Sequence, residues 1–99
     1  MFEDFTKEYQ DCNILKMYCG TNCPQGGDAG HGGVTKFEIL DEGGTAFKIK
    51  YKNHPKGKWQ DMGNVYNVGL VLFGDSEART FIKALEDAAK FLRKQINEE

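Results

Sequence analysis

The residues best suited to chemistry gather in one glycine-rich segment, residues 20–33, which reads GTNCPQGGDAGHGG. Glycine occupies six of these fourteen positions. Each glycine loses more backbone entropy on folding than another residue would, so stability alone does not explain such a segment. Glycine does allow backbone N–H groups to come close to a bound anion. The composition therefore favours a loop that captures a small polar or phosphorylated ligand.

The predicted binding site combines glycine amides, which form a nest for an anion, with polar side chains that read a base or a sugar. The predicted ligand-binding residues are Thr21, Asn22, Gln25, Gly26, Gly27, Asp28, Gly30, His31, Gly32 and Gly33. The segment matches neither a G-x-G-x-x-G turn that opens a helix nor a Walker loop, and a strand is predicted after it. We therefore predict a non-enzymatic binding protein with a nucleotide-derived ligand, in preference to a nucleotide-processing enzyme.

Cysteine and histidine side chains give two further interpretations of the same loop. Cys19, Cys23 and His31 could hold zinc, together with Cys12 or Asp28, because thiolate and imidazole ligands close a tetrahedral site. Cys-x3-Cys with one histidine nevertheless falls short of the paired Cys-x2-Cys pattern. Alternatively, Cys23 could be a nucleophile with His31 as its base and Asp28 as orienter, although one flexible loop supports such a triad poorly. We expect no catalytic residue, no resident metal and no cofactor.

A loop that binds nothing is the remaining interpretation, because many loops are solvated connectors. Unstructured loops of more than about twelve residues are, however, uncommon in compact domains unless they are functional or disordered. The alternative function is a protein–protein inhibitor or interaction module, with or without a structural zinc, in which the loop or an exposed sheet edge contacts the partner. Its partner would be a host protein.

Lysines gather in the middle of the chain, at positions 36, 48, 50, 52, 56 and 58. They offer a basic face for phosphates, yet exposed lysines on strands also protect sheets from aggregation, and we favour that role. Trp59 and Tyr66 have rings that stack on bases, although aromatic residues of a small domain usually lie in its core. With 13 basic and 15 acidic residues and a net charge of −2, nucleic acid is not expected as a partner.

The C-terminal segment predicts an amphipathic helix over residues 77–96. Its apolar residues recur at helical spacing: Ala78, Phe81, Ile82, Leu85, Ala88, Ala89, Leu92 and Ile96. Charged residues, Arg79 among them, occupy the opposite, wet face. Asp75 and Ser76 are natural N-cap residues directly after Gly74. A single apolar stripe predicts that the helix packs on one face of a sheet.

Alternating apolar residues predict the strands of that sheet. Phe37 and Ile39 share one face of a strand, and residues 47–51 form the next, with Gly43-Gly44 between them, which predicts a β-hairpin. Residues 65–73 predict a central strand, and residues 14–19 a short one that a short helix precedes. The loop-rich residues 53–63 include Trp59, in a short extra strand. The predicted fold is α+β, an antiparallel sheet of about four strands with the C-terminal helix on one face and the glycine-rich loop after the first strand.

Length and composition bound these expectations. At 99 residues the chain has the size of one domain, so we expect a single domain over residues 1–99. Apolar residues make up 39% of it, which argues against disorder. It has no run of about 18 apolar residues that could span a membrane, and its N-terminal residues lack the basic and apolar regions of a secretion signal. We therefore expect a cytoplasmic protein without membrane association. Three cysteines, an odd number, fit free thiols better than a disulfide framework. A homodimer is compatible with these features.

Two segments resemble small bacteriophage-type proteins: residues 18–33, YCGTNCPQGGDAGHGG, and residues 74–92, GDSEARTFIKALEDAAKFL. Together they cover a little over a third of the chain. The resemblance carries no assigned catalytic residues. It implies a protein that acts by stoichiometric binding, either blocking a host protein or sequestering a host signalling molecule.

Overall fold

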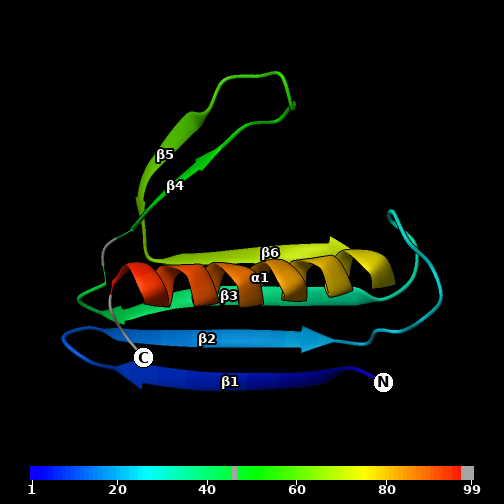
Figure 1. Ribbon diagram of the computed structural model, residues 1–99, viewed down its shortest axis with the longest axis horizontal. Coiled ribbons are helices and arrows are strands. Elements are labelled where there is room, and N and C mark those ends of the chain that lie inside the picture. The colour runs from blue at the N-terminus through cyan, green and yellow to red at the C-terminus, as the bar shows by residue number, and fades with distance from the viewer. Residues whose placement is uncertain (46, 97–99) are drawn as a thin grey trace. The chain divides into compact units, whose positions relative to one another are not determined.

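The computed structural model describes residues 1–45 and 47–96. Within them the chain forms β1 (Glu3–Gln10), β2 (Ile14–Thr21), β3 (Val34–Gly43), β4 (Phe47–Tyr51), β5 (Gln60–Val65), β6 (Asn67–Phe73) and α1 (Asp75–Gln95) (Figure 1). No helix among these residues is both long and apolar enough to cross a membrane. The elements confirm the predicted α+β class.

The strands form two antiparallel sheets (Figure 1). The larger has the strand order β1-β2-β3-β6, as expected for a sheet of about four strands, and the smaller pairs β4 with β5. The chain divides into two compact units. We call them the helix unit, which comprises residues 1–3, 20–35 and the chain from residue 71 on, and the hairpin unit, which comprises residues 4–19 and 36–70.

In the helix unit, α1 begins at Asp75, two residues before the predicted start. Its first turns pack against the strand ends of the same unit, where Ala78 is only 5% exposed and shares a pocket with Thr21 of β2 and Thr35 of β3. Further along α1, the large residues of the predicted apolar stripe are 40–63% exposed: Ile82, Leu85, Leu92 and Ile96. The best-covered part of the helix is therefore its N-terminal end.

The predicted hairpin around Gly43-Gly44 is wrong. β3 pairs inside the four-stranded sheet, whereas β4 pairs with β5, with Phe47 opposite Val65 and Tyr51 opposite Gln60. The strands predicted on both sides of the two glycines do form. Their alternating apolar residues indicate the strands but carry no information about which strand pairs with which.

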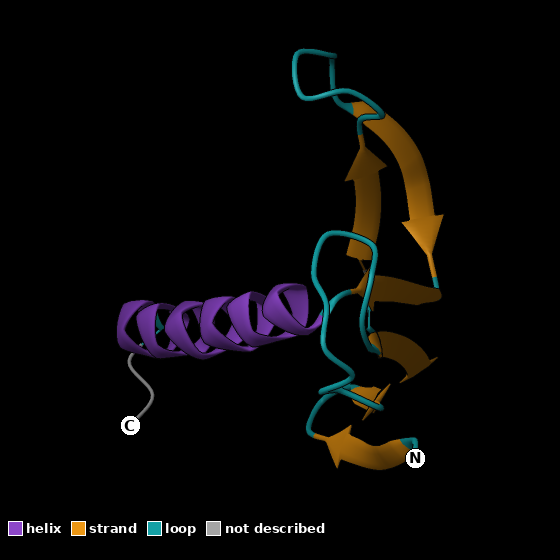
Figure 2. Cartoon of the chain, turned by 90° about the vertical axis from the view of Figure 1, so that its right-hand side faces the viewer, coloured by secondary structure: helices purple, strands orange, loops and turns teal. Residues whose placement is uncertain are grey.

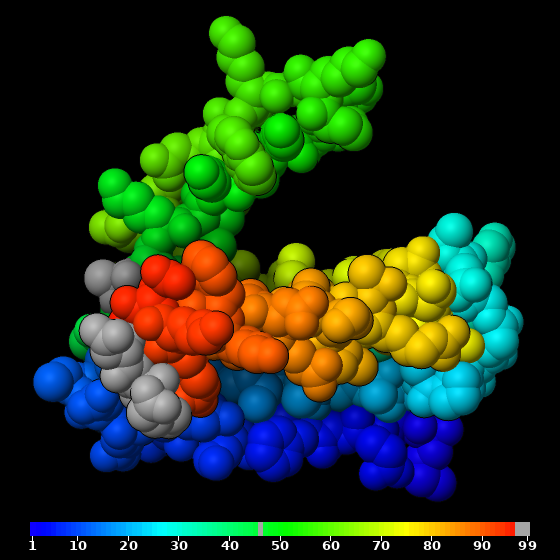
Figure 3. All heavy atoms as spheres, in the orientation of Figure 1, coloured from blue at the N-terminus to red at the C-terminus, as the bar shows by residue number. Residues whose placement is uncertain are grey.

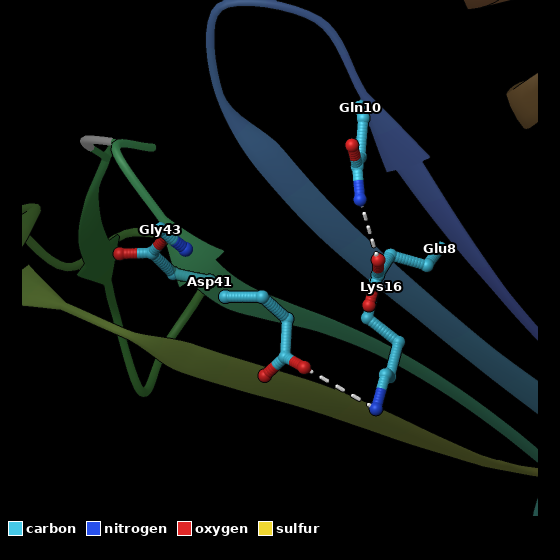
Figure 4. Close-up of polar contacts among 6 residues, drawn as sticks. Glu8, Gln10, Lys16, Asp41 and Gly43 are labelled. Atoms are coloured by element: carbon cyan, nitrogen blue, oxygen red, sulfur yellow. Dashed lines mark hydrogen bonds and ion pairs between the residues drawn. The ribbon is translucent and has the colours of Figure 1, made fainter.

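The turn after β3 explains why the chain does not fold straight back. Oδ1 of Asp41 accepts hydrogen bonds from the N–H of Gly43 at 2.9 Å, a pair seen in Figure 4, and from the N–H of Thr45 at 3.2 Å. The Thr45 hydroxyl in turn donates to the carbonyl of Ile14 at 3.3 Å and accepts from Nδ2 of Asn13 at 2.7 Å. Thr45 is thus bonded both to Asp41 of β3 and to Ile14 at the start of β2.

Two polar contacts of the hairpin unit lie at the solvent-exposed surface. Nε2 of Gln10 donates to Oε2 of Glu8 at 3.0 Å (Figure 4). Nζ of Lys16 lies 3.3 Å from Oε1 of Glu42. Exposed ion pairs contribute at most about 1 kcal/mol to stability. The hairpin unit therefore depends more on its backbone hydrogen bonds and part-buried turn contacts than on these charges.

The N-terminal segment forms the strand β1, so the short helix predicted there is wrong. Phe5 and Tyr9 are four residues apart, and this spacing places two side chains on the same side of a strand as well as of a helix. The pattern therefore fits both structures. Because β1 is a strand, the glycine-rich loop follows the second strand of the chain.

The strand predicted over residues 65–73 also lies in a different place from the one expected. The chain is interrupted at Tyr66, and β6 is an edge strand instead of a central one. Apolar residues on both faces of a strand are typical of the centre of a sheet, which is why the sequence predicts a central place. In β6 these side chains remain 49–54% exposed: Leu70, Val71 and Phe73.

We predict that Gly44→Ala lowers the free energy of unfolding by about 1–2 kcal/mol, because Gly44 has a φ of 74°, a conformation that costs L residues roughly this much. Steric crowding is not the cause, since an added Cβ would lie 3.7 Å from its nearest neighbours. Gly44→Asn should lose less, because asparagine tolerates this conformation. Urea unfolding measures both variants, and equal losses for the two would contradict a conformational cause.

Candidate functional site

The glycine-rich loop, residues 22–33 between β2 and β3, is organised by one carboxylate at the start of α1. Oδ2 of Asp75 accepts hydrogen bonds from the N–H of Gln25 at 2.9 Å and of Gly26 at 2.6 Å. Oδ1 accepts from the N–H of Gly33 at 2.9 Å and, more weakly, from Gln25 at 3.1 Å. Asp75 is 4% exposed. Figure 2 shows the loop beside the first turn of the helix.

Backbone hydrogen bonds join the same two segments. The N–H of Asp75 donates to the carbonyl of Gly27, and the N–H of Gly74 to the carbonyl of Gly33, both at 2.8 Å. The N–H of Gly30 donates to the carbonyl of Phe73 at 2.9 Å. The loop atoms accordingly abut the first turns of α1 in the space-filling view (Figure 3). The loop is thus a folded cap on the helix end.

The capping of α1 differs from the prediction. Gly74 occupies the N-cap position and supplies no side-chain hydrogen bond. The cap comes from the loop instead, because Oδ1 of Asp28 accepts a hydrogen bond from the N–H of Ser76 at 2.7 Å. In return, Oε2 of Glu77 accepts from the N–H of Ala29 at 2.9 Å. Predicting Asp75 as the cap was wrong because its side chain points at the loop amides, not at the helix's own N–H groups.

The loop glycines have a steric role that composition does not reveal. A Cβ on Gly32 would lie 2.5 Å from the carbonyl oxygen of Gly27, and a Cβ on Gly27 would lie 2.8 Å from the backbone nitrogen of Gly32. A Cβ on Gly33 would collide with Sγ of Cys23. Glycine therefore allows the loop to fold against itself, which accounts structurally for part of its entropic cost.

The amides predicted to bind an anion are partly engaged already. Those of Gly26 and Gly33 donate to Asp75, and that of Gly30 donates to Phe73. The carboxylate of Asp75 thus sits where the phosphate of a ligand was expected. Three of the five predicted glycine amides therefore already have an acceptor within the protein.

The same contacts set the ionisation of Asp75. Hydrogen bonds from the N–H groups of Gly33, Gln25 and Gly26 lower the pKa of this carboxyl from its ordinary 3.8 to about 2. Burial acts in the opposite direction, and the Cys23 thiol adds a smaller lowering effect. Asp75 therefore stays negatively charged at pH values well above 2.

Two threonines and one cysteine form a polar cluster beside Asp75. The hydroxyls of Thr21 and Thr35 are 2.8 Å apart, and that of Thr21 accepts a hydrogen bond from the N–H of Cys23 at 3.0 Å. The Cys23 sulfur lies 3.5 Å from the Thr35 hydroxyl and 4.0 Å from the carbonyl oxygen of Gly74. The thiol is therefore a small donor inside this cluster.

This cluster borders a pocket of about 250 Å³ that belongs entirely to the helix unit. Its lining combines the polar cluster with apolar side chains and one guanidinium: Thr21, Cys23, Pro24, Thr35, Asp75, Ala78, Arg79 and Ile82. Of the predicted ligand-binding residues, only Thr21 lines it. Sequence reasoning missed Thr35 and Arg79, although both flank the loop directly in the folded chain. The wet face predicted for Arg79 agrees with its exposure and says nothing about its neighbours.

The remaining predicted binding residues hold the loop together. Oδ1 of Asn22 accepts from the N–H of Val34 at 2.8 Å, and its carbonyl accepts from Nε2 of Gln25 at 2.6 Å. His31 is exposed, and its backbone N–H donates to the backbone carbonyl of Asp28 at 3.2 Å. The carboxylate of Asp28 bonds to α1, so the structure does not assemble the triad with Cys23.

The cysteines are free thiols at three separate positions of the chain. Cys12 is exposed, and Cys19 and Cys23 are partly buried. Among residues 1–45 and 47–96, no three or more histidine, cysteine, aspartate or glutamate side chains form a group suited to a metal ion.

Replacing Asp75 by asparagine should disorder the loop, because an amide offers one acceptor where the carboxylate offers two and turns donors toward the loop N–H groups. We expect the melting temperature to fall by at least about 5 °C, a shift typical of small domains that lose a hydrogen bond or two. Hydrogen exchange at Gly26 and Gly33 should accelerate. Asp87→Asn, on the exposed face of α1, is the control, and equal melting temperatures for the two variants would contradict the assignment.

The lowered pKa of Asp75 predicts a distinct response to acid. The folded value of about 2 lies below the ordinary 3.8, so the stabilisation is complete above about pH 4 and is lost as the pH falls toward 2. Other carboxyl groups titrate in the same range, so the test is a difference. The difference in unfolding free energy between the wild type and Asp75→Asn should become smaller as the pH is lowered from 5 to 2, because Asp75 is protonated within this range. A constant gap over this range would refute the shift.

Comparison of the chain with protein-family models, with curated proteins and with solved structures gives no match. What the pocket does must accordingly be inferred from its residues. Those residues offer two hydroxyls, one thiol and one guanidinium beside a small apolar surface.

Proposed function

We propose that the protein is a non-enzymatic binding protein that captures a small, anionic, nucleotide-derived ligand in the pocket of the helix unit. The observation that carries the proposal is the lining of this pocket, where Arg79 and the hydroxyls of Thr21 and Thr35 surround an apolar floor that includes Ala78 and Ile82. Ligand pockets typically combine an apolar surface with a few polar groups that fix the orientation of the ligand.

Each part of a phosphorylated ligand has a counterpart in this lining. The Arg79 guanidinium suits a phosphate, to which it can donate two parallel hydrogen bonds. The threonine hydroxyls both donate and accept, as a sugar or base edge requires. Asp75 opposes an anion less than an unpaired carboxylate would, because three loop amides already donate to it.

The size of the pocket limits what it holds. At about 250 Å³ it lies just below the ~300–1,000 Å³ of most small-molecule sites. It therefore suits one phosphate-bearing sugar or one base of a ligand, with the remainder of a larger molecule left outside. Mono- and cyclic nucleotides are the first ligands to test.

The order of the loop supports capture over catalysis. Its bonds to Asp75, Ser76 and Glu77 already fix the loop against the helix, so little loop entropy remains to be lost on binding. Preorganisation of this kind favours tight, stoichiometric binding. That mode agrees with the sequestration of a host signalling molecule, which the bacteriophage-type resemblance implies.

A protein–protein inhibitor is the second candidate, and one observation favours it. β6 is an edge strand whose apolar side chains are about half exposed, and exposed edges accept a further strand from a partner. A host protein that adds a strand there would be held by backbone hydrogen bonds. This candidate needs no ligand in the pocket.

The test is a thermal-shift and calorimetric screen of mono-, di- and cyclic nucleotides against the wild type and two pocket variants. A ligand that binds only the folded protein raises the melting temperature by an amount that grows with its concentration. Arg79→Ala should weaken binding roughly 10- to 100-fold, because it removes charge-assisted hydrogen bonds. Ala78→Leu should abolish binding by filling the pocket.

Matched controls separate binding from folding. Arg93→Ala removes the same charge from the last turn of α1, and Ala88→Leu enlarges an exposed position of the same helix. Both should bind like the wild type. If no nucleotide stabilises the wild type, or if the control variants lose as much affinity as the pocket variants, the small-ligand proposal fails and the edge-strand inhibitor becomes the better candidate.

A further inference from the structure

Positive charge is concentrated in one part of the chain, the hairpin segment, residues 47–65, which comprises β4, β5 and their connection. It contains five of the 13 basic residues, all lysines, and one of the 15 acidic residues, so its net charge is 5 − 1 = +4. The rest of the chain has eight basic and 14 acidic residues, a net charge of 8 − 14 = −6. The overall charge of −2 therefore conceals a strongly basic hairpin.

The lysines in and directly after β4 share one face of the hairpin. Lys48, Lys50 and Lys52 alternate with the apolar residues of the strand, so their side chains leave on the same side. The register puts Lys50 opposite Asp61, and Trp59, two residues before Asp61, shares its side by the same alternation. This face therefore carries three ammonium groups, one indole ring and the single carboxylate of Asp61.

Trp59 is held at this face by the lysines. Nζ of Lys50 and Nζ of Lys52 each lie 4.9 Å from the centre of its ring, the geometry of a cation–π contact. The side chain nevertheless remains 57% exposed. A large aromatic ring is thus presented to solvent between two positive charges.

The charge of the hairpin is not neutralised locally. Oδ1 of Asp61, its single acid, accepts a hydrogen bond from the N–H of Gly63 at 2.7 Å and so serves the bulge of β5. The ion pairs found within residues 1–45 and 47–96 are Lys16–Glu42 and Lys83–Asp87, and neither includes a hairpin lysine. The hairpin therefore presents a positive field to an incoming partner.

From this arrangement we propose that the hairpin segment binds single-stranded nucleic acid, with the lysines on phosphates and Trp59 stacked on a base. Proteins that bind single strands without sequence preference combine a positive surface with exposed aromatic rings in this way. All five basic residues are lysines, which contact phosphates as point charges and do not read base edges in pairs of bonds as arginine does. Binding is accordingly independent of sequence.

A purely protective role for the lysines, or an acidic protein partner, fits the hairpin less well. Lysines that protect a strand edge from aggregation account for β4, but not for Lys56 and Lys58 in the connecting loop or for an exposed tryptophan. An acidic protein would match the charge, yet lysine is depleted from protein–protein interfaces. A phosphate backbone with bases beside it matches both the charge and the ring.

The test uses Trp59 as its own reporter, because it is the one tryptophan of the chain. An oligodeoxythymidylate of about 12 nucleotides, within the ~4–16 that one binding module covers, is added to the full chain at low salt. Stacking should quench the tryptophan fluorescence in a saturable way. Anisotropy of a labelled copy of the oligonucleotide measures affinity independently of the tryptophan.

Variants separate stacking from charge. Trp59→Ala should weaken binding about 5- to 150-fold, and Trp59→Phe, which keeps an aromatic face, should lose less. Lys50→Ala and Lys52→Ala should each lower the slope of log K against log salt by about 0.7. Lys90→Ala on α1 changes the net charge equally and should leave the affinity and slope nearly unchanged. Circular dichroism confirms that each variant is folded.

Polyglutamate and inorganic polyphosphate of matched charge complete the experiment. Weaker binding of both than of the oligonucleotide, with no quenching, is the expected result. The proposal is overturned if polyglutamate binds as tightly, which would indicate an acidic protein partner, or if polyphosphate does, which would indicate charge alone. Absence of oligonucleotide binding at low salt would overturn it as well. The hairpin residues are separate from the pocket lining, so this outcome is independent of the proposed ligand capture.

Discussion

One carboxylate at the start of α1 determines the shape of the candidate site. Asp75 is nearly buried and accepts hydrogen bonds from the backbone of Gln25, Gly26 and Gly33. Buried charge is tolerated in proteins only where such partners exist, so the loop and the carboxylate require one another. Further bonds, including those of Asp28 and Glu77, join the same two segments.

This contact changes the role that we assign to the loop glycines. A glycine-rich loop beside a helix start suggests a nest for a ligand's phosphate, since amides and helix dipole both favour an anion. Here a side chain of the protein itself is that anion, held at the first residue of the helix. The pocket beside the loop adds side-chain donors, among them Arg79 and Thr35. In the proposed binding mode the ligand lies beside the loop instead of inside it, and the loop holds one wall of the pocket.

Sequence patterns are sufficient for the elements and insufficient for their pairing. The helical spacing from Ala78 to Ile96 predicts α1 closely, and the alternation around Phe37 and Ile49 predicts two real strands. The partners of those strands lie elsewhere in the chain, and contacts such as that of the Thr45 hydroxyl with the start of β2 have no signal in the local sequence pattern. The central position predicted for β6 is wrong for a related reason. Apolar residues on both faces of a strand indicate burial but do not identify the element that covers them.

The candidate site can be located from sequence but not described. Six glycines in one loop draw attention to a segment that borders the pocket. The other lining residues are ordinary in sequence: a threonine near the start of a strand and an arginine on a helix's wet face. Averages mislead in the same way. A net charge of −2 means that the chain as a whole is not basic. Charges interact over only about 10 Å at ordinary salt, however, so the charge that a partner meets is that of the nearby surface residues. At the hairpin these are lysines around one tryptophan.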